Sequence, residues 1–394
     1  MNNQELAFEK LSRLKVGALF MEQGTGKTKV ALDLIASKKD KVNYILWICP
    51  YSIKQEIECE RKKWQPNLKI EIVGCETLSM SDTTYINIYN KVLQNKTFIV
   101  VDESLKIKNR EAKRTQRILE LGKNAKYKLI LNGTPLSKNV LDLYTQMNFL
   151  SPKILNMSFN EFKNKYCEYY IRGKLKNKVK KQYNIEHLIS LIRPYIFDCE
   201  LDLGKGKKYE QVFYQIENKE EYENIKKNFL NFDSDINFFA LATSLQKNYC
   251  TSNLKLNIVS ELVNSINKQV IIFVKYINSI PSGEKRITGE MKTSEREKII
   301  DDFKNNKFKA LYITYGCGAF GLNLQNCDTI IFADHTFDYA ERLQAEARIY
   351  RLGQEKDVRY IDLIRGCLRK KTKLLDEVKK EIENKGVEEW LKII

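Results

Sequence analysis

Residues 16–36 read VGALFMEQGTGKTKVALDLIA, and this stretch decides the fold class. It begins with a short apolar run over 16–21, continues through a glycine-rich turn, and ends in a helical pattern over about 27–38. A buried strand that leads through a tight turn into a helix is the repeating unit of parallel α/β sheets. The stretch therefore predicts a parallel, doubly wound sheet covered by helices.

The turn between the predicted strand and helix has the residues that hold phosphate groups. Gly24 and Gly26 let backbone N–H groups curl around phosphate oxygens, and the start of the following helix adds a partial positive charge. At this spacing Lys27 is expected to reach the β- and γ-phosphates, and the Thr28 hydroxyl to bind Mg2+. Met21 stands where the usual pattern has its first glycine. The alternative is a glycine-rich turn without function, which the unbroken run over 24–28 disfavours.

An acidic pair follows another predicted strand. Residues 97–101 form an apolar run that ends at Asp102 and Glu103. Carboxylates at the end of such a strand suit an ATP site, in which Asp102 holds Mg2+ and Glu103 lies beside the attacking water. An acidic strand end by itself is usually just solvated. In combination with the glycine-rich turn, we interpret the pair as catalytic.

Strand-like and helical runs alternate through the first 150 residues and again after about residue 255. The later part includes predicted helices over 294–304 and 339–350. The stretch between is rich in Lys, Asn, Tyr and Phe and has helical periodicity. We predict two α/β lobes of comparable size, with these divisions: lobe 1 in 1–150, a mainly helical insertion and crossing segment in 151–250, lobe 2 in 251–370, and an amphipathic helix in 371–394.

Composition narrows the class of protein. The net charge of +17, from 67 basic and 50 acidic residues, favours a polyanionic partner such as nucleic acid. Most of the basic residues are lysine, which has AT-rich codons. A GC-poor genome is therefore an alternative source of part of this charge. The N-terminus has no signal-like apolar region, and no apolar run is long enough for a membrane span. The nine scattered cysteines predict neither a zinc site nor a disulfide framework. We expect a cytoplasmic protein.

Five ordered motifs resemble the Snf-type ATPases, a branch of helicase superfamily II. Residues 102–109, DESLKIKN, resemble the D-E-x-H-x-I-K-N box of that family, and residues 131–150 resemble its L-T-G-T-P segment. Residues 48–52, ICPYS, are similar to its strand–Pro–Ser element. Residues 321–324, GLNL, and 344–354, QAEARIYRLGQ, resemble the G-L-N-L and Q-A-x-x-R-x-x-R-x-G-Q boxes.

The resemblance implies two tandem RecA-like P-loop lobes, with ATP and Mg2+ in the cleft and double-stranded DNA across both. It implies a translocase that moves along duplex DNA through sequence-independent phosphate contacts. A strand-separating helicase and a DNA-binding clamp with weak ATPase activity remain alternatives. The clamp remains because Leu105 replaces the usual His of the acidic box. The expected source is a phage or a low-GC bacterium.

The resemblance also carries roles to individual residues. Arg348 and Arg351 are three apart, so on a helix they would share a face, as arginine fingers for a γ-phosphate would. The predicted catalytic residues are Lys27, Asp102, Glu103, Arg348 and Arg351. Those predicted to bind ATP are Gly24, Thr25, Gly26, Lys27, Thr28, Gln4 and Gln354. Those predicted to couple nucleotide to the lobes are Asn132, Gly133, Thr134, Gly321, Asn323 and Gln344. Those predicted to contact DNA are Pro50, Tyr51, Ser52, Thr134 and Thr314.

Overall fold

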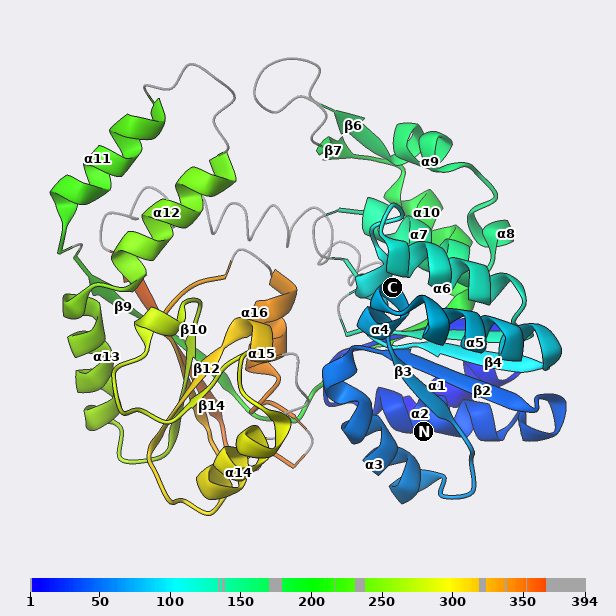
Figure 1. Ribbon diagram of the computed structural model, residues 1–394, viewed down its shortest axis with the longest axis horizontal. Coiled ribbons are helices and arrows are strands. Elements are labelled where there is room, and N and C mark those ends of the chain that lie inside the picture. Colours follow the sequence, from blue (N-terminus) through cyan, green and yellow to red (C-terminus); the bar gives the residue numbers. More distant parts are fainter. Residues whose placement is uncertain are drawn as a thin grey trace. The chain divides into compact units, whose positions relative to one another are not determined.

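The structure is a computed structural model, and it describes residues 2–133, 135–136, 139–169, 179–215, 217–230, 238–318, 324–336, 339–351 and 353–365. The chain divides into two compact units, of which the first runs to Leu201 and the second begins at Asp202 (Figure 1). Each unit is built on its own six-stranded sheet.

The sheet of the first unit has the strand order β3-β2-β4-β5-β1-β8, and all its strands are parallel. Its strands are β1 (Val16–Met21), β2 (Tyr44–Cys49), β3 (Glu71–Gly74), β4 (Thr97–Val101), β5 (Tyr127–Leu131) and β8 (Ile196–Cys199). Parallel neighbours need a crossover connection, which helices supply here. The glycine-rich turn therefore leaves the sheet from β1, between β5 and β8.

Both faces of this sheet are covered, because its strands are apolar at successive positions. Leu19 and Met21 of β1 belong to one buried cluster, and Ala18 and Phe20 belong to the other. The first cluster includes residues of α1 (Asn3–Ser12), α2 (Lys27–Ala36) and α3 (Lys54–Trp64). The second includes residues of α4 (Cys75–Met80), α5 (Asp82–Gln94), α6 (Lys113–Lys123), α7 (Leu141–Leu150), α8 (Pro152–Leu155), α9 (Phe159–Tyr166) and α10 (Ile185–Ile192).

The second unit repeats this design with the strand order β11-β12-β10-β13-β14-β9, again all parallel. Its strands are β9 (Lys207–Tyr214), β10 (Val270–Val274), β11 (Arg286–Ile287), β12 (Ala310–Thr314), β13 (Thr329–Phe332) and β14 (Val358–Arg365). Its helices are α11 (Lys219–Leu230), α12 (Phe238–Cys250), α13 (Asn253–Ser265), α14 (Thr293–Lys304), α15 (Tyr315–Gly318) and α16 (Tyr339–Glu346). Short 3-10 turns complete the two units: η1 (Lys39–Lys41), η2 (Tyr51–Ile53), η3 (Ser104–Ile107), η4 (Arg193–Tyr195) and η5 (Ile277–Ser279).

The predicted fold class, two α/β lobes with parallel sheets, is confirmed. The segment predicted as a helical insertion, 151–250, is shared between the units instead of standing apart. It contributes β8 to the first sheet and β9 to the second, and it also forms an antiparallel hairpin of β6 (Cys167–Tyr169) and β7 (Val179–Gln182). β6, β7 and β8 have only three or four residues each, which is too short for a recognisable apolar run. The C-terminal helix predicted over 371–394 lies outside the described residues.

Within the described ranges, no helix combines the length and the apolar character that crossing a membrane requires.

Candidate active site

The glycine-rich turn joins β1 to α2 at the carboxyl edge of the first sheet. Its backbone depends on glycine at two positions, because Gly24 and Gly26 have φ values of 83° and 88°. α2 begins directly after them at Lys27. The first N–H groups of a helix have no partner within the helix, so this turn is a suitable place for an anion.

The Lys27 side chain folds back along the turn. Its Nζ donates to the carbonyl oxygens of Met21 (2.8 Å) and Glu22 (3.2 Å). Burial lowers the pKa of Lys27, and the negative charges of Glu103 and Asp102 oppose that shift. The ammonium group therefore lies within electrostatic reach of both carboxylates of the acidic pair.

The acidic pair follows β4, as the sequence predicts. Asp102 is 8% exposed and its Oδ1 accepts a hydrogen bond from the Glu103 backbone N–H (2.9 Å). Glu103 has a φ of 49°, which is uncommon for a residue with a side chain. Burial raises the pKa of Asp102 to about 7, with a further contribution from Glu103 that Lys27 opposes. Two adjacent carboxylates near one lysine suit the binding of a divalent cation, which would favour their charged forms.

Gln4 reaches the same turn from α1. Its Nε2 donates to the carbonyl oxygen of Thr25 (3.1 Å). A Cβ atom added to Gly26 would lie 2.2 Å from this Nε2, so the glutamine amide packs directly on the glycine. α1 is held in place at its start by a reciprocal capping box of Asn2 and Glu5. The structure thus brings Gln4 to the turn, and its contact with ATP stays a prediction.

The loop after β5 also lies against the turn. A Cβ atom on Gly133 would lie 3.1 Å from Gln23 Cγ and 3.5 Å from Lys27 Nζ, so a side chain there would crowd the lysine. Asn132 is buried, and its backbone N–H donates to Leu19 O (3.0 Å) of β1. Two predicted coupling residues are therefore next to the predicted phosphate site. Thr134 lies outside the described residues.

A buried hydrogen-bond relay behind the acidic pair was not predicted. Ser104 follows Glu103, and its hydroxyl donates to Gln146 Oε1 (2.6 Å) on α7. Gln146 Nε2 donates in turn to the carbonyl oxygens of Pro135 (2.9 Å) and Asp142 (2.7 Å). Ser104 and Gln146 are both fully buried. The relay joins the acidic pair to the loop after β5. No sequence pattern indicated it, because its members are 42 residues apart.

A second unpredicted contact connects the turn to the end of the first unit. The side chain of Glu22 accepts a hydrogen bond from the backbone N–H of Leu201 (2.7 Å), and the Glu22 N–H donates to Cys199 O (2.8 Å). The Glu22 carbonyl is also the acceptor for the Thr25 hydroxyl (2.7 Å). One residue of the turn thus holds the chain directly before the second unit begins at Asp202.

The predicted DNA contacts of the first unit follow β2. Pro50 is buried, so its ring is not available to a partner. Tyr51 is 64% exposed, Lys54 Nζ lies 5.5 Å from its ring centroid, and its N–H donates to Glu76 Oε2 (2.9 Å). Ser52 is partly buried. The exposed surface at this place therefore comes from an aromatic side chain and a neighbouring lysine.

In the second unit, the helix predicted over 339–350 ends early. α16 stops at Glu346, and residues 347–351 continue as turns. The backbone leaves the helical path where the carbonyl of Arg348 accepts a hydrogen bond from Leu324 N–H (3.2 Å). The prediction that Arg348 and Arg351 share a helix face is therefore wrong. Arg348 is 6% exposed, whereas Arg351 is partly exposed.

Gln354 is buried inside the second unit. Its Nε2 donates to the carbonyl oxygens of Gln325 (3.1 Å), Cys327 (3.0 Å) and Ile349 (3.1 Å), and its Oε1 accepts from Lys356 N–H (3.1 Å). This amide ties the chain after α16 to the loop before β13. All four hydrogen bonds are internal to the unit, and the contact of Gln354 with the nucleotide stays a prediction.

Three other predicted residues complete the second unit. Gln344 is on α16 and partly buried. Thr314 ends β12, and its hydroxyl donates to Cys317 Sγ (3.3 Å). Gly321 and Asn323 lie outside the described residues.

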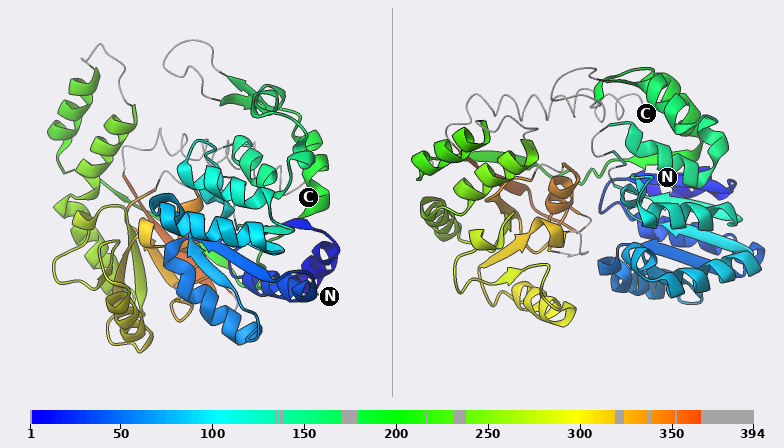
Figure 2. Two further views of the ribbon diagram at one scale, coloured as in Figure 1. Left: turned by 45° about the vertical axis from the view of Figure 1, so that its right-hand side comes forward. Right: turned by 45° about the horizontal axis from the view of Figure 1, so that its top comes forward.

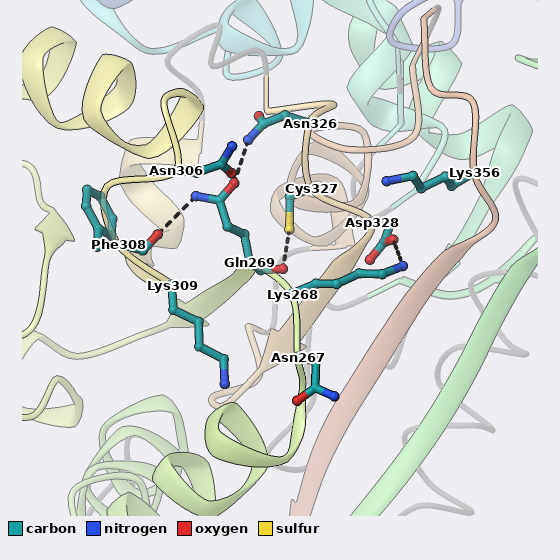
Figure 3. A pocket seen from close by; sticks show the side chains of 10 residues that line it. All are labelled: Asn267, Lys268, Gln269, Asn306, Phe308, Lys309, Asn326, Cys327, Asp328 and Lys356. Atoms are coloured by element: carbon teal, nitrogen blue, oxygen red, sulfur yellow. Dashed lines mark hydrogen bonds and ion pairs between the residues drawn. The ribbon is translucent and has the colours of Figure 1, made fainter.

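A surface pocket of about 470 Å³ in the second unit does not coincide with these residues (Figure 3). Its walls include residues directly before β10, β12 and β13, namely Gln269, Lys309 and Asp328. It therefore lies at the amino ends of parallel strands, whereas ligands of open α/β sheets bind at the carboxyl ends. Gln269 Nε2 donates to Phe308 O (3.0 Å), and Lys268 pairs with Asp328 (2.8 Å), so these groups bond to one another.

Comparison with protein families gives two matches. The model of the SNF2-related domain matches residues 58–254, and the model of the helicase conserved C-terminal domain matches residues 254–353. The first match spans half of the chain.

Individual relatives agree with these families. The SWI/SNF chromatin-remodeling complex subunit snf22 of Schizosaccharomyces pombe is 24% identical, over 88% of this chain and 25% of its own length. The SWI/SNF-related matrix-associated actin-dependent regulator of chromatin subfamily A-like protein 1 of Drosophila melanogaster is 27% identical, over 73% of this chain and 42% of its own length. The chain thus spans less than half the length of either relative. A solved structure, the Sulfolobus solfataricus SWI2/SNF2 ATPase core in complex with dsDNA, is 24% identical, with coverage of 96% and 91% and a TM-score of 0.45.

Proposed function

The chain belongs to the family of SNF2-related domains, and we propose that it is a motor that couples hydrolysis of Mg-ATP to movement along duplex DNA. One observation carries the proposal. The ammonium group of Lys27, in a turn that requires glycine at two positions, lies within electrostatic reach of both Asp102 and Glu103. A lysine that grips phosphates next to carboxylates for a metal ion and a water is the arrangement that phosphoryl transfer uses.

In this proposal the first unit binds and activates the nucleotide. Lys27 exchanges its bonds to the Met21 and Glu22 carbonyl oxygens for bonds to the β- and γ-phosphates. Gln4, next to the turn, lies near the adenine. Glu103 orients the attacking water and accepts its proton.

Thr28 and Asp102 are the residues that we propose as ligands of Mg2+. The buried carboxylate of Asp102 fits this role, because burial and Glu103 raise its pKa despite Lys27, and a bound divalent cation would favour its charged form. When bound, Mg2+ would neutralise charge that develops on the phosphate oxygens. The chain's own contribution is to hold the Asp102 carboxylate in position, through the hydrogen bond from Glu103 N–H.

The second unit supplies positive charge for the γ-phosphate. We assign this contact to Arg351, which is partly exposed. Arg348, buried in the second unit, would have to move outward to share it. We expect Gln344, Gly321 and Asn323, together with Asn132, Gly133 and Thr134, to couple the nucleotide to movement.

Duplex DNA is the proposed track. Tyr51, Ser52, Thr134 and Thr314 are the proposed phosphate contacts, and such contacts are independent of sequence and sensitive to salt. For its location we propose the cytoplasm of a bacterium or of a phage-infected host.

The first test is the rate of ATP hydrolysis with and without linear duplex DNA. We expect duplex DNA to stimulate hydrolysis and Lys27→Ala to abolish it. The matched control is Lys29→Ala, two residues further along α2, whose side chain pairs with Asp33 (2.8 Å) and is partly exposed. A rate that DNA does not change, or that survives the loss of Lys27, contradicts the motor and leaves a DNA-binding clamp.

A second test separates translocation from strand separation. A motor that moves on duplex DNA should displace a triplex-forming oligonucleotide in an ATP-dependent reaction and should not unwind a forked duplex. Unwinding of the fork would make the protein a helicase.

A third test concerns Arg351. Arg351→Ala should abolish hydrolysis while nucleotide binding persists. Hydrolysis that persists in this variant would reject the assignment of Arg351 to the γ-phosphate.

A further inference from the structure

A short hairpin in the first unit carries an excess of positive charge. It consists of the end of α9, β6 and β7, whose strands pair antiparallel with Cys167 opposite Gln182 and Glu168 opposite Lys181. Between residues 163 and 181 the sequence has eight basic residues and one acidic residue. Four of the basic residues, Lys163, Lys165, Lys180 and Lys181, lie in the part that the structure describes, and with Glu168 they give this part a net charge of +3. We call the described part, residues 163–169 and 179–182, the basic hairpin.

Little in the hairpin neutralises this charge. Its single acidic side chain, Glu168, pairs with Lys180 (2.8 Å), and both side chains are exposed to a substantial degree, 39% and 50%. Lys165 and Lys181 are exposed as well. Like charges at this density repel one another, and a polyanion relieves that repulsion. A lysine-rich composition does not by itself explain why the excess gathers in one stretch of the sequence.

The base of the hairpin is rigid. Tyr166, at the end of α9, is fully buried, and its backbone carbonyl accepts a hydrogen bond from Tyr183 N–H (3.0 Å). The side chain of Asn184 donates to the carbonyl of Lys165 (2.9 Å). Lys163 Nζ lies 4.4 Å from the ring centroid of Tyr169 on β6, a cation–π distance. The lysines are therefore carried on a fixed base, which reduces the entropy lost when they bind a partner.

The hairpin is also joined to the loop that follows β5. Gln182 Oε1 accepts a hydrogen bond from Val140 N–H (2.8 Å), directly before α7 begins at Leu141. The chain that leads into α7 includes Asn132 and Gly133, which lie next to the nucleotide turn. The charged surface is thus anchored to the same segment of the first unit as the proposed active site.

We propose that the basic hairpin binds the phosphate backbone of duplex DNA, as a contact surface in addition to the motif residues. The proposal rests on the proposed function, because that function supplies the DNA. Lysines on a rigid base suit phosphates, which they contact as point charges without reading sequence. Figures 1 and 2 show β6 and β7 at the end of the first unit opposite α3, so the hairpin and α3 can be tested independently.

The test compares two pairs of neighbouring lysines. The hairpin variant is Lys180→Gln with Lys181→Gln, and the matched control on α3 is Lys62→Gln with Lys63→Gln. In each pair one lysine has a carboxylate partner, Glu168 for Lys180 and Glu58 for Lys62. Both variants lose two positive charges, so a general effect of net charge would appear in both. Unchanged thermal unfolding of the two variants verifies that each is folded.

The measurement is the affinity of the full chain for a fluorescent 30-base-pair duplex, as a function of salt. Each phosphate contact contributes about 0.9 to the slope of log K against log salt. We expect the hairpin variant to reduce the slope by about 2 and to weaken binding at least tenfold at 100 mM salt, by the same relation. The α3 variant should keep the wild-type slope.

Three results would overturn the proposal. A hairpin variant with the wild-type slope would show that the lysines make no phosphate contact. An equal loss in the α3 variant would assign the effect to net charge. Equal weakening of binding to poly-L-glutamate would make the hairpin a site for polyanions in general. Wild-type protein that does not bind the duplex at all would instead reject the proposed function, which distinguishes the two failures.

Discussion

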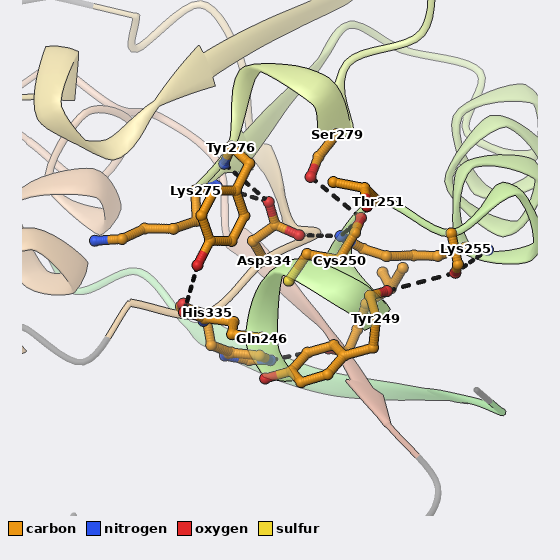
Figure 4. A network of polar contacts seen from close by, with 12 residues as sticks. Gln246, Tyr249, Cys250, Thr251, Lys255, Lys275, Tyr276, Ser279, Asp334 and His335 are labelled. Atoms are coloured by element: carbon orange, nitrogen blue, oxygen red, sulfur yellow. Dashed lines mark hydrogen bonds and ion pairs between the residues drawn. The ribbon is translucent and has the colours of Figure 1, made fainter. Parts of the chain in front are cut away.

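Lys255 and Asp334 form an ion pair in the second unit, and neither side chain is exposed to solvent (Figure 4). Lys255 comes from α13, and Asp334 follows β13. The lysine also donates to Cys250 O (2.9 Å), and the second carboxylate oxygen of Asp334 accepts from Lys275 N–H (2.7 Å). The pair thus connects the end of α12, the start of α13 and the ends of two neighbouring strands.

Asp334→Asn should destabilise the second unit strongly. The asparagine can still accept from Lys275 N–H, but it leaves the Lys255 charge buried without its partner. Breaking a buried pair on one side costs about 3–5 kcal/mol. The measurement is hydrogen exchange of peptides from α13 and β13, which should exchange faster in the variant.

The double variant Lys255→Met with Asp334→Asn is the control for this prediction. Because it removes both charges, it should lose less stability than Asp334→Asn. Equal losses of stability in the two variants would mean that the unpaired charge of Lys255 is not what destabilises Asp334→Asn.

Ser104→Ala should interrupt the relay behind the acidic pair. It removes the hydroxyl that donates to Gln146 Oε1 and leaves a buried acceptor without that donor, at a cost of about 1–3 kcal/mol. Because the relay reaches the Pro135 carbonyl, we expect kcat for ATP hydrolysis to fall more than the affinity for ATP. Thr97→Val, which removes a buried hydroxyl at the other end of β4, should affect stability without this split. The same kcat in wild type and Ser104→Ala would leave the relay with a purely structural role.

Glu22→Ala should loosen the chain that leads out of the first unit. Leu201 is buried, and its N–H loses the carboxylate that it donates to. Glu22→Gln keeps an oxygen acceptor and should behave nearly as wild type. Limited proteolysis followed by mass spectrometry should show faster cleavage near residues 199–206 in the alanine variant. Equal cleavage of both variants would indicate that the hydrogen bond does not hold this segment.

Lys128→Met should stabilise the protein at neutral pH. Burial lowers the pKa of Lys128 from 10.5 to about 8, and its Nζ lies 5.8 Å from the Phe149 ring centroid. The folded state therefore binds the proton less tightly than the unfolded state, so wild-type stability rises between about pH 8 and 10.5. The advantage of the methionine should be largest below pH 8 and small near pH 10.5. Thermal unfolding across this range measures it.

The exposed neighbour Lys126 provides the comparison. Lys126→Met should change the melting temperature little at any pH, because the side chain is exposed. An advantage of Lys128→Met that is the same at pH 7 and pH 10.5 would exclude the cost of burying charge as its cause.

The strands that the sequence predicted well are those buried on both faces. β1 and β4 begin and end at the predicted residues, because buried parallel strands appear as uninterrupted apolar runs. β3 and β8 escaped prediction. β3 is a four-residue strand at the edge of its sheet, and β8 contains Asp198. Edge position and short length remove the apolar run on which the prediction depends.

The candidate site likewise has parts that the sequence predicts and parts that it does not. The glycine-rich turn and the acidic pair are local patterns, and the structure brings Lys27, Asp102 and Glu103 together. The Ser104–Gln146 and Glu22–Leu201 contacts join residues far apart in the sequence, which no local pattern indicates. After the early end of α16, the Arg348 carbonyl accepts a hydrogen bond from Leu324 N–H, a contact from outside the helix that the helical periodicity of 339–350 does not show.

Each six-stranded sheet takes its strands from one side of the peptide bond between Leu201 and Asp202. That bond therefore completes neither sheet. The bond instead affects how fast the two units meet, because a short tether holds two partners at an effective concentration on the order of millimolar. If Arg351 must meet a nucleotide held by Lys27, the tether makes that encounter independent of how much protein the cell contains. Two separate polypeptides divided at this bond would have to find each other by diffusion, and their rate of hydrolysis would depend on dilution.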